Sequence, residues 1–228
     1  MGCKGENRTS TNQETMGIEL NPPKEIVYKD SKAIYKYFQD IENKEKPLTL
    51  PQVKRYAWNY ILHKCPFFKL TKENKKLLKD LSEYVVGEGE LNPEKGIYLY
   101  GAYGVGKSLI MEPFMNLLKA KQKTTIRLVD EYNETENFKE YGTGDWYFDD
   151  LGAEKLPKFF KAGSEPLMTE VLQERYSKTH QGFEKGRTFV SSNLGPKNFS
   201  EMYGARVASR MKQMFNIIEL PGIDYRNT

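Results

Sequence analysis

The sequence predicts an α/β fold with a mostly parallel β-sheet, and three observations lead to this prediction. Short apolar runs of the kind that form strands recur along the chain from residue 97 onward, at residues 97–100, 125–129, 146–148, 188–191 and 216–220. Segments with helical spacing lie between some of these runs, at residues 109–121 and 165–179. A glycine-rich turn joins the first run to the first of these helices. Strands that alternate with helices are typical of a parallel sheet covered by helices.

The first half of the chain predicts helices instead. Residues 1–21 are polar and are expected to be disordered. Apolar positions then recur at helical spacing in three segments, at residues 31–41, 52–63 and 72–86, the last with Thr71 as its N-cap. We therefore divide the chain into a disordered tail, an N-terminal helical appendage that binds a partner, and a nucleotide-binding domain, at residues 1–21, 22–65 and 66–228.

Composition limits the partners and the cellular location that we expect for the protein. Its net charge of +4 is too small to indicate nucleic-acid binding by itself. Cys3 and Cys65 are far apart and match no metal-ligand spacing, so we expect a reducing, cytoplasmic location. No apolar run is long enough to cross a bilayer, which argues against a membrane partner. Gly2 resembles an acylation start, but Glu6 stands where Ser or Thr is required.

Residues 101–108 match the phosphate-binding pattern G-x-x-x-x-G-K-[ST] at every fixed position. The match follows an expected strand and opens an expected helix, and Pro113 is expected to kink or shorten that helix. Glycines let backbone N–H groups turn toward phosphate oxygens, Lys107 reaches the β- and γ-phosphates, and Ser108 places its hydroxyl on Mg²⁺. The predicted ATP-binding residues are Gly101, Ala102, Tyr103, Gly104, Val105, Gly106, Lys107, Ser108 and Leu109.

Polar side chains end two further strands. Asp149 and Asp150 follow the apolar run 146–148, and nucleotide sites in open α/β sheets lie at this end of the strands. We expect Asp149 to hold Mg²⁺ and Asp150 to orient or deprotonate the attacking water, although aspartates are also common in turns. If the strand 188–191 lies between the other two, Asn193 points at the γ-phosphate or the water; otherwise it forms a turn before Gly195.

These residues occur in an order that resembles the DnaC/IstB group of AAA+ ATPases, the helicase loaders and transposase helper ATPases. After the phosphate loop come Asp149-Asp-Leu-Gly-Ala-Glu154, Gln173-Glu-Arg-Tyr176, Ser191-Ser-Asn-Leu194, Tyr203-Gly-Ala-Arg-Val-Ala-Ser-Arg210 and Gly222-Ile-Asp-Tyr-Arg226. The resemblance covers residues 66–226. It implies a five-stranded AAA+ core whose subunits assemble side by side with ATP at their interfaces. It also implies a trans-acting arginine, for which Arg210 is the best match and Arg206 the second.

The sequence departs from this family in three places. The stretch between Leu128 and Asp145 is short and polar, so a helix there is expected to be reduced. The chain ends at residue 228, which leaves no room for the helical lid of many AAA+ proteins; Arg226 is a candidate substitute for the lid's sensor arginine. Asp150 stands where many AAA+ proteins have the longer glutamate, so we expect slow hydrolysis.

Four functions remain open at this stage. The first is an ATPase that loads or remodels a replicative helicase on single-stranded DNA, and the second is a transposase helper on duplex DNA. The third is a small-molecule kinase, and the fourth is a nucleotide-gated scaffold with little turnover. A basic helix stripe that would contact DNA phosphates consists of Lys69, Lys72, Lys75, Lys76 and Lys79, although a solvated helix face is the commoner interpretation. Tyrosines at 56 and 60 would either stack on bases or belong to a core.

Overall fold

The computed structural model describes residues 31–154, 166–180, 184–222 and 224. The predicted tail 1–21, Cys3 and Arg226 lie outside the described residues. Seven α-helices and five strands make up the described chain, in the order α1, α2, α3, β1, α4, β2, α5, a 3₁₀ turn η1, β3, α6, β4, α7 and β5.

The centre of the protein is a five-stranded parallel sheet, as the sequence predicts. Its strands, in spatial order, are β2 (Lys121–Thr124), β3 (Trp146–Leu151), β4 (Thr188–Ser192), β1 (Gly96–Tyr100) and β5 (Phe215–Glu219). Since β4 pairs with both β1 and β3, the ends of the strands that carry the phosphate loop, Asn193 and Asp149 lie next to one another.

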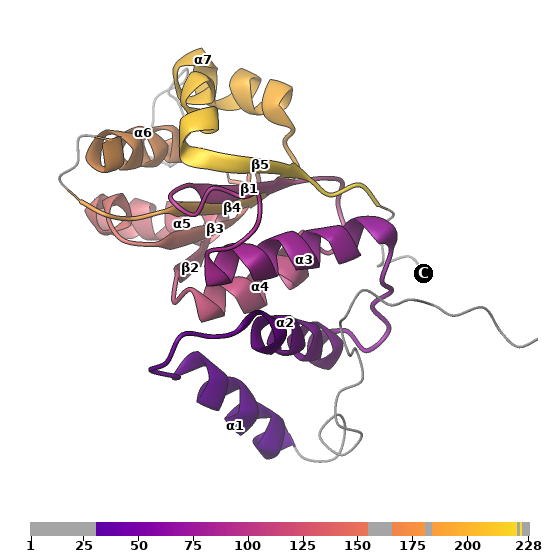
Figure 1. The fold of residues 1–228 in the computed structure, drawn as a ribbon. Helices are drawn as coiled ribbons and strands as arrows, with labels where there is room; N and C mark the ends of the chain where they lie inside the picture. The colour runs from indigo at the N-terminus through magenta and orange to yellow at the C-terminus, as the bar shows by residue number, and fades with distance from the viewer. Residues whose placement is uncertain (1–30, 155–165, 181–183, 223, 225–228) are drawn as a thin grey trace, which may run out of the picture.

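Helices cover both faces of the sheet, because its strands are apolar on both sides (Figure 1). On one face, Ile97 and Leu99 of β1 pack in a cluster with α2 (Leu50–Lys64), α3 (Lys72–Val86) and α4 (Lys107–Leu117). On the other face, Tyr98 of β1 packs with α5 (Thr125–Thr135), α6 (Leu167–His180) and α7 (Pro196–Met214). The alternation of side chains along β1 thus assigns each apolar residue to one of the two cores.

The N-terminal helices form successive layers below α4 in Figure 1. Helix α2 buries Ala57 and Ile61 in the same cluster as α3, α4 and the sheet. Helix α1 (Ser31–Glu42) lies outside α2, and its Phe38 packs against Tyr56 and Tyr60. Both tyrosines are buried, so they belong to a core rather than to a surface that stacks bases. The division of the chain at residue 65 stays a prediction about partner binding.

The predicted strand at residues 125–129 is wrong, because this segment forms α5. The neighbouring strand is the short polar run of β2, which pairs with β3 at the edge of the sheet. The Thr124 side chain accepts a hydrogen bond from the Arg127 N–H and caps the helix. Leu128 and Val129 are buried against β3 while Ile126 is exposed, so a β-branched run serves as one face of a helix. We expected a reduced helix between Leu128 and Asp145. The helix in this region is α5, which starts earlier, at Thr125, and ends at Thr135.

The end of one helix also differs from the sequence prediction. Helix α4 continues through Pro113 and ends at Leu117, four residues before the expected end. Lys119 then adopts a φ of 55°, which turns the chain into β2. Helix α3 has the predicted bounds: Thr71 accepts from the Asn74 N–H at its start, and Gly87 ends it with a φ of 76°.

Candidate active site

The phosphate loop connects β1 to α4 at the carboxyl end of the sheet. Gly104 and Gly106 have φ values of 74° and 89°, which glycine adopts without steric cost. A Cβ atom at Gly101 would lie 2.3 Å from the Leu220 carbonyl oxygen, so only glycine allows the loop to pass this close to the chain after β5. Val105 anchors the loop in the core, whereas Tyr103 is 67% exposed.

The Lys107 side chain contacts two of the predicted site segments, the phosphate loop and the end of β4. Its side chain is only 5% exposed. The ammonium donates to the carbonyl oxygens of Gly101 and Ala102 at 3.0 and 2.8 Å, and to Asn193 Oδ1 at 2.7 Å. The loop's cation is therefore held between the phosphate loop and the end of β4, beside the residue that we expected to face the γ-phosphate.

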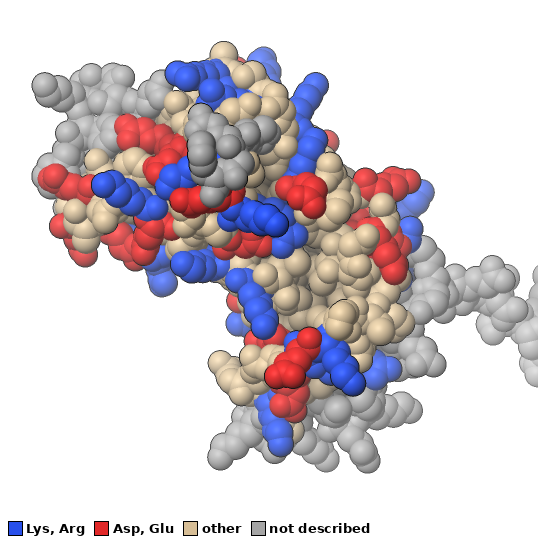
Figure 2. All heavy atoms as spheres, turned by 60° about the vertical axis from the view of Figure 1, so that its left-hand side comes forward, with Lys and Arg blue, Asp and Glu red and all other residues tan. Residues whose placement is uncertain are grey.

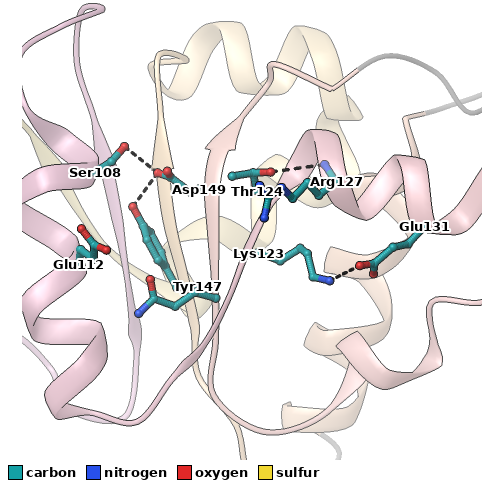
Figure 3. Close-up of a pocket in the computed structure, with 9 residues that line it drawn as sticks. Ser108, Glu112, Lys123, Thr124, Arg127, Glu131, Tyr147 and Asp149 are labelled. Atoms are coloured by element: carbon teal, nitrogen blue, oxygen red, sulfur yellow. Dashed lines mark hydrogen bonds and ion pairs between the residues drawn. The ribbon is translucent and has the colours of Figure 1, made fainter. Parts of the chain in front are cut away.

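Three hydroxyl groups converge on one oxygen of Asp149. Ser108 Oγ and the Tyr147 hydroxyl donate to Asp149 Oδ1 at 2.8 and 2.7 Å, as Figure 3 shows, and Ser191 Oγ donates to the same atom. Burial, together with the charge of Asp149, raises the pKa of Tyr147 well above its usual value, so the phenol stays a donor. The predicted metal residues Ser108 and Asp149 are thus in direct contact.

Asp150 occupies a bend in β3. Its φ is 57°, which is uncommon for a residue other than glycine, and the pairing of β3 with β4 shifts register between Phe148 and Leu151. Its N–H donates to Ser191 Oγ at 3.1 Å, and its carbonyl accepts from Thr125 Oγ1 at 2.8 Å. Side chains on β4 and α5 therefore hold the backbone of this residue in its left-handed conformation.

A cavity of about 380 Å³ opens beside this group (Figure 3). Its walls come from α4, β2, α5 and β3, and they carry both acids and bases: Ser108, Glu112, Gln122, Lys123, Thr124, Arg127, Glu131, Tyr147 and Asp149. Sequence reasoning missed Lys123 and Arg127 because it assigned a strand where α5 begins. Tyr147 and Ser191 were also missed as site residues, although Tyr147 lies two positions before Asp149 and so on the same face of the strand.

The two candidate arginines lie on α7, and neither is among the Lys107 contacts described above. Gly204 has a φ of 80° and a ψ of 156°, which breaks α7, and both arginines follow this break. Arg206 is exposed, whereas the Arg210 guanidinium lies 4.3 Å from the centre of the Tyr176 ring. A single chain does not test a role toward a neighbouring subunit, so both assignments stay predictions.

Arg175, in one of the motif segments, has a structural role instead. It is 1% exposed, and it donates to Thr188 Oγ1 at 2.7 Å and to the carbonyl oxygens of Gly144, Arg187 and Tyr141. Tyr141 belongs to η1, and the other three partners lie near the amino ends of β3 and β4, opposite to the phosphate loop. Burial lowers the pKa of Arg175 to about 10, which still leaves it charged at neutral pH.

Four of the five lysines of the basic stripe lie on α3, and two of these four pair with acids of the same helix. Lys76 pairs with Asp80 at 2.6 Å, and Lys79 pairs with Glu83 at 3.5 Å. Figure 2 likewise shows basic and acidic side chains interspersed over the face that it draws. Acids on the same helix thus offset two of the five lysines, and a contact between this stripe and DNA stays a prediction.

The residues at the carboxyl end of the sheet fit a nucleotide with Mg²⁺. Glycines shape the loop, a buried ammonium lies within it, and a hydroxyl and a carboxylate meet beside it. Mg²⁺ in nucleotide sites is commonly bound by one or two carboxylates together with phosphates and water. Within the described residues, no helix is both long and apolar enough to span a membrane.

Comparisons with known proteins agree with this architecture. No protein-family model matches the chain. The replicative helicase loader DnaI of Bacillus subtilis strain 168 is 24% identical over 176 residues, a match that covers 66% of this chain and 54% of the relative. The chain thus spans about half the length of the curated relative that it matches.

Two solved structures have a similar fold. A crystal structure of DnaI has a TM-score of 0.50 and 22% identity, and the match covers 70% of this chain and 88% of that one. A crystal structure of the DnaC helicase loader has a TM-score of 0.52 and 16% identity, with 72% and 98% covered. The resemblance to DnaC-like AAA+ proteins that the motif order predicts is confirmed at the level of the fold.

Proposed function

We propose that this chain, which has the AAA+ fold of the DnaC-type helicase loaders, binds and hydrolyses ATP with Mg²⁺ and loads or remodels a replicative DNA helicase on single-stranded DNA. The observation that carries the ATP part is the convergence of Lys107, Ser108, Asp149 and Asn193 at one edge of the sheet. The observation that carries the helicase part is the likeness to the loader DnaI. Such a partner works in the cytoplasm, where we expect this protein.

Each residue at the site has a distinct task. Residues 101–109 cradle the phosphates, and Lys107 neutralises the β- and γ-phosphate charge. Ser108 and Asp149 hold Mg²⁺, which offsets the charge that develops on the phosphate oxygens. Asp150 orients or deprotonates the attacking water, and Asn193 hydrogen-bonds the γ-phosphate or that water. Because Asn193 contacts Lys107 directly, the end of β4 responds to any movement of the lysine.

Self-association would complete the site. We propose that Arg210, or Arg206 as the alternative, reaches the γ-phosphate of a neighbouring subunit and stabilises the transition state. The exposure of Arg206 supports a contact outside its own chain. In Arg210 the stacking on Tyr176 would have to be exchanged for a phosphate contact.

Phosphate release tests the ATPase assignment. We expect wild-type protein with Mg²⁺ to release phosphate slowly. We expect Lys107→Ala and Asp149→Ala to lower that rate at least about tenfold, because the first removes the cation that faces the phosphates and the second removes the carboxylate that binds Mg²⁺. The measurement is made with and without single-stranded DNA. Equal release by all three proteins would contradict the site assignment.

Co-elution tests the partner. Wild-type protein is mixed with the replicative helicase of the same host, with and without ATP, and separated by size-exclusion chromatography. A complex supports the loader assignment, and two separate peaks under both conditions contradict it. A Lys107→Ala variant in the same experiment reports whether complex formation needs the nucleotide.

Three alternatives have their own signatures. A transposase helper of the same fold forms filaments on duplex DNA, which electron microscopy detects. A nucleotide-gated scaffold binds ATP at normal affinity with little turnover, an outcome that the short side chain of Asp150 allows. A small-molecule kinase transfers phosphate to an acceptor without needing protein or DNA. The cavity beside Asp149 is the observation that keeps this last alternative open, since it adjoins the predicted γ-phosphate position.

A further inference from the structure

A buried carboxylate lies four residues after Asp150, and the nucleotide site does not use it. Glu154 is 7% exposed. Its Oε2 accepts from the Gly152 N–H at 2.7 Å, and its Oε1 accepts from the Tyr203 hydroxyl. Glu154 takes part in none of the ion pairs among the described residues. Burying a carboxylate against neutral donors is costly, so packing alone does not account for this residue.

The other end of the contact is on α7. Tyr203 is 1% exposed within the aromatic cluster of Tyr98 and Phe199. Burial and the charge of Glu154 raise the pKa of Tyr203 above its usual value, so the phenol remains a neutral donor. Tyr203 immediately precedes Gly204, where the helix breaks. The phenol therefore holds α7 at its break, just before the segment that carries Arg206 and Arg210.

The loop between Asp150 and Glu154 is tightly constrained. Gly152 has a φ of 98°, and a Cβ atom there would lie 2.6 Å from Leu194 Cδ1. Ser192 Oγ donates to the Leu151 carbonyl at 2.6 Å and accepts from the Leu194 N–H at 3.0 Å. The end of β4 next to Asn193 and this loop thus form one hydrogen-bonded unit, and Glu154 connects that unit to α7.

We infer that Glu154 and Tyr203 are positioning residues that couple the loop after Asp150 to the arginine-bearing segment of α7. A change in the conformation of Asp150 moves Gly152 and Glu154 through the short loop. The Glu154–Tyr203 hydrogen bond passes this movement to the break at Gly204. The inference rests on the proposed function, because the change that it transmits is ATP binding beside Asp150.

The test compares variants that differ by a single polar group. Tyr203→Phe removes only the hydroxyl, and Glu154→Gln keeps a carbonyl acceptor while it removes the charge. Tyr100→Phe is the matched control, because the Tyr100 hydroxyl also donates to a glutamate, Glu219, but at the surface. Thermal unfolding identifies the temperature range in which all four proteins are folded.

The first readout separates binding from turnover. We expect Tyr203→Phe to bind ATP with a dissociation constant within about twofold of wild type, and to lose about tenfold in kcat, or ~1.4 kcal/mol of activation free energy. Glu154→Gln is expected to fall between wild type and Tyr203→Phe, and Tyr100→Phe to match wild type. A folded Tyr203→Phe variant with wild-type kcat would overturn the inference.

The second readout does not depend on hydrolysis. Amide hydrogen exchange is followed with and without ATP and Mg²⁺ in residues 150–154 and 205–214. In wild type we expect ATP to change exchange in both segments, and in Tyr203→Phe only in the first. A response in both segments of the variant refutes the coupling and leaves the proposed function intact. Absence of ATP binding by wild type refutes the proposed function, and the inference with it.

Discussion

Replacing Arg175 by methionine should destabilise the fold without damaging the nucleotide site. The methionine fills much of the same volume but donates no hydrogen bonds. The change leaves the Thr188 hydroxyl and three carbonyl oxygens without their donor, two of these contacts being fully buried. An unsatisfied buried polar group costs about 1–3 kcal/mol.

The expected loss follows from these contacts. The two buried contacts together correspond to about 2–6 kcal/mol, and removing a buried charge returns part of this, so we expect a net loss of about 1–4 kcal/mol. For a chain of this size, 1 kcal/mol shifts the melting temperature by about 2–4 °C, which gives a decrease of roughly 2–16 °C.

Thermal unfolding followed by circular dichroism measures this effect, and isothermal titration with ATP is carried out below the lower melting temperature. Arg206→Ala is the control for stability, because Arg206 is exposed and its replacement should change the stability by less than about 0.5 kcal/mol. A decrease of less than about 2 °C in Arg175→Met would refute the reasoning. So would a loss of ATP affinity in protein that is still folded.

Three further predictions concern the nucleotide site. Tyr147→Phe removes one donor from Asp149 and should change the apparent Mg²⁺ affinity about threefold or more while Mg²⁺-free ATP binding stays the same; titration of Mg²⁺ checks this, and an unchanged Mg²⁺ dependence would contradict it. Asp224→Asn removes a carboxylate that contacts Gly104 and should tighten ATP binding about fivefold at low salt. The reason is that repulsion between a carboxylate and a phosphate near 4 Å apart is worth about 1 kcal/mol in water, and equal or weaker binding counts against it. In wild type, ATP at 100 times its dissociation constant should raise the melting temperature by about 5–11 °C. Lys107→Ala should abolish this increase, and a normal increase in the variant would exclude the assigned role of the lysine.

Local sequence patterns predicted most of the candidate site residues. The phosphate loop is contiguous, and its glycines, lysine and serine are required by the geometry of phosphate binding, so their spacing is informative without the fold. Asp149 and Asn193 were predicted because polar residues at the ends of apolar strands meet at one edge of a parallel sheet, and the structure places them in contact with Ser108 and Lys107. The Asn193 interpretation depended on the condition that β4 lies between β3 and β1, and the strand order meets this condition.

Only the tertiary structure decided the other features. Residues 125–129 have the composition of a strand, but the cap at Thr124 and burial against β3 make them a helix. Arg175 belongs to a motif segment, yet its hydrogen-bond partners lie 12 to 34 residues away in the sequence, on η1 and near the amino ends of β3 and β4. The Glu154–Tyr203 contact joins residues 49 positions apart. Spacing along the chain determines which groups a single loop can offer to a phosphate, whereas the packing of helices on the sheet determines which distant side chains meet.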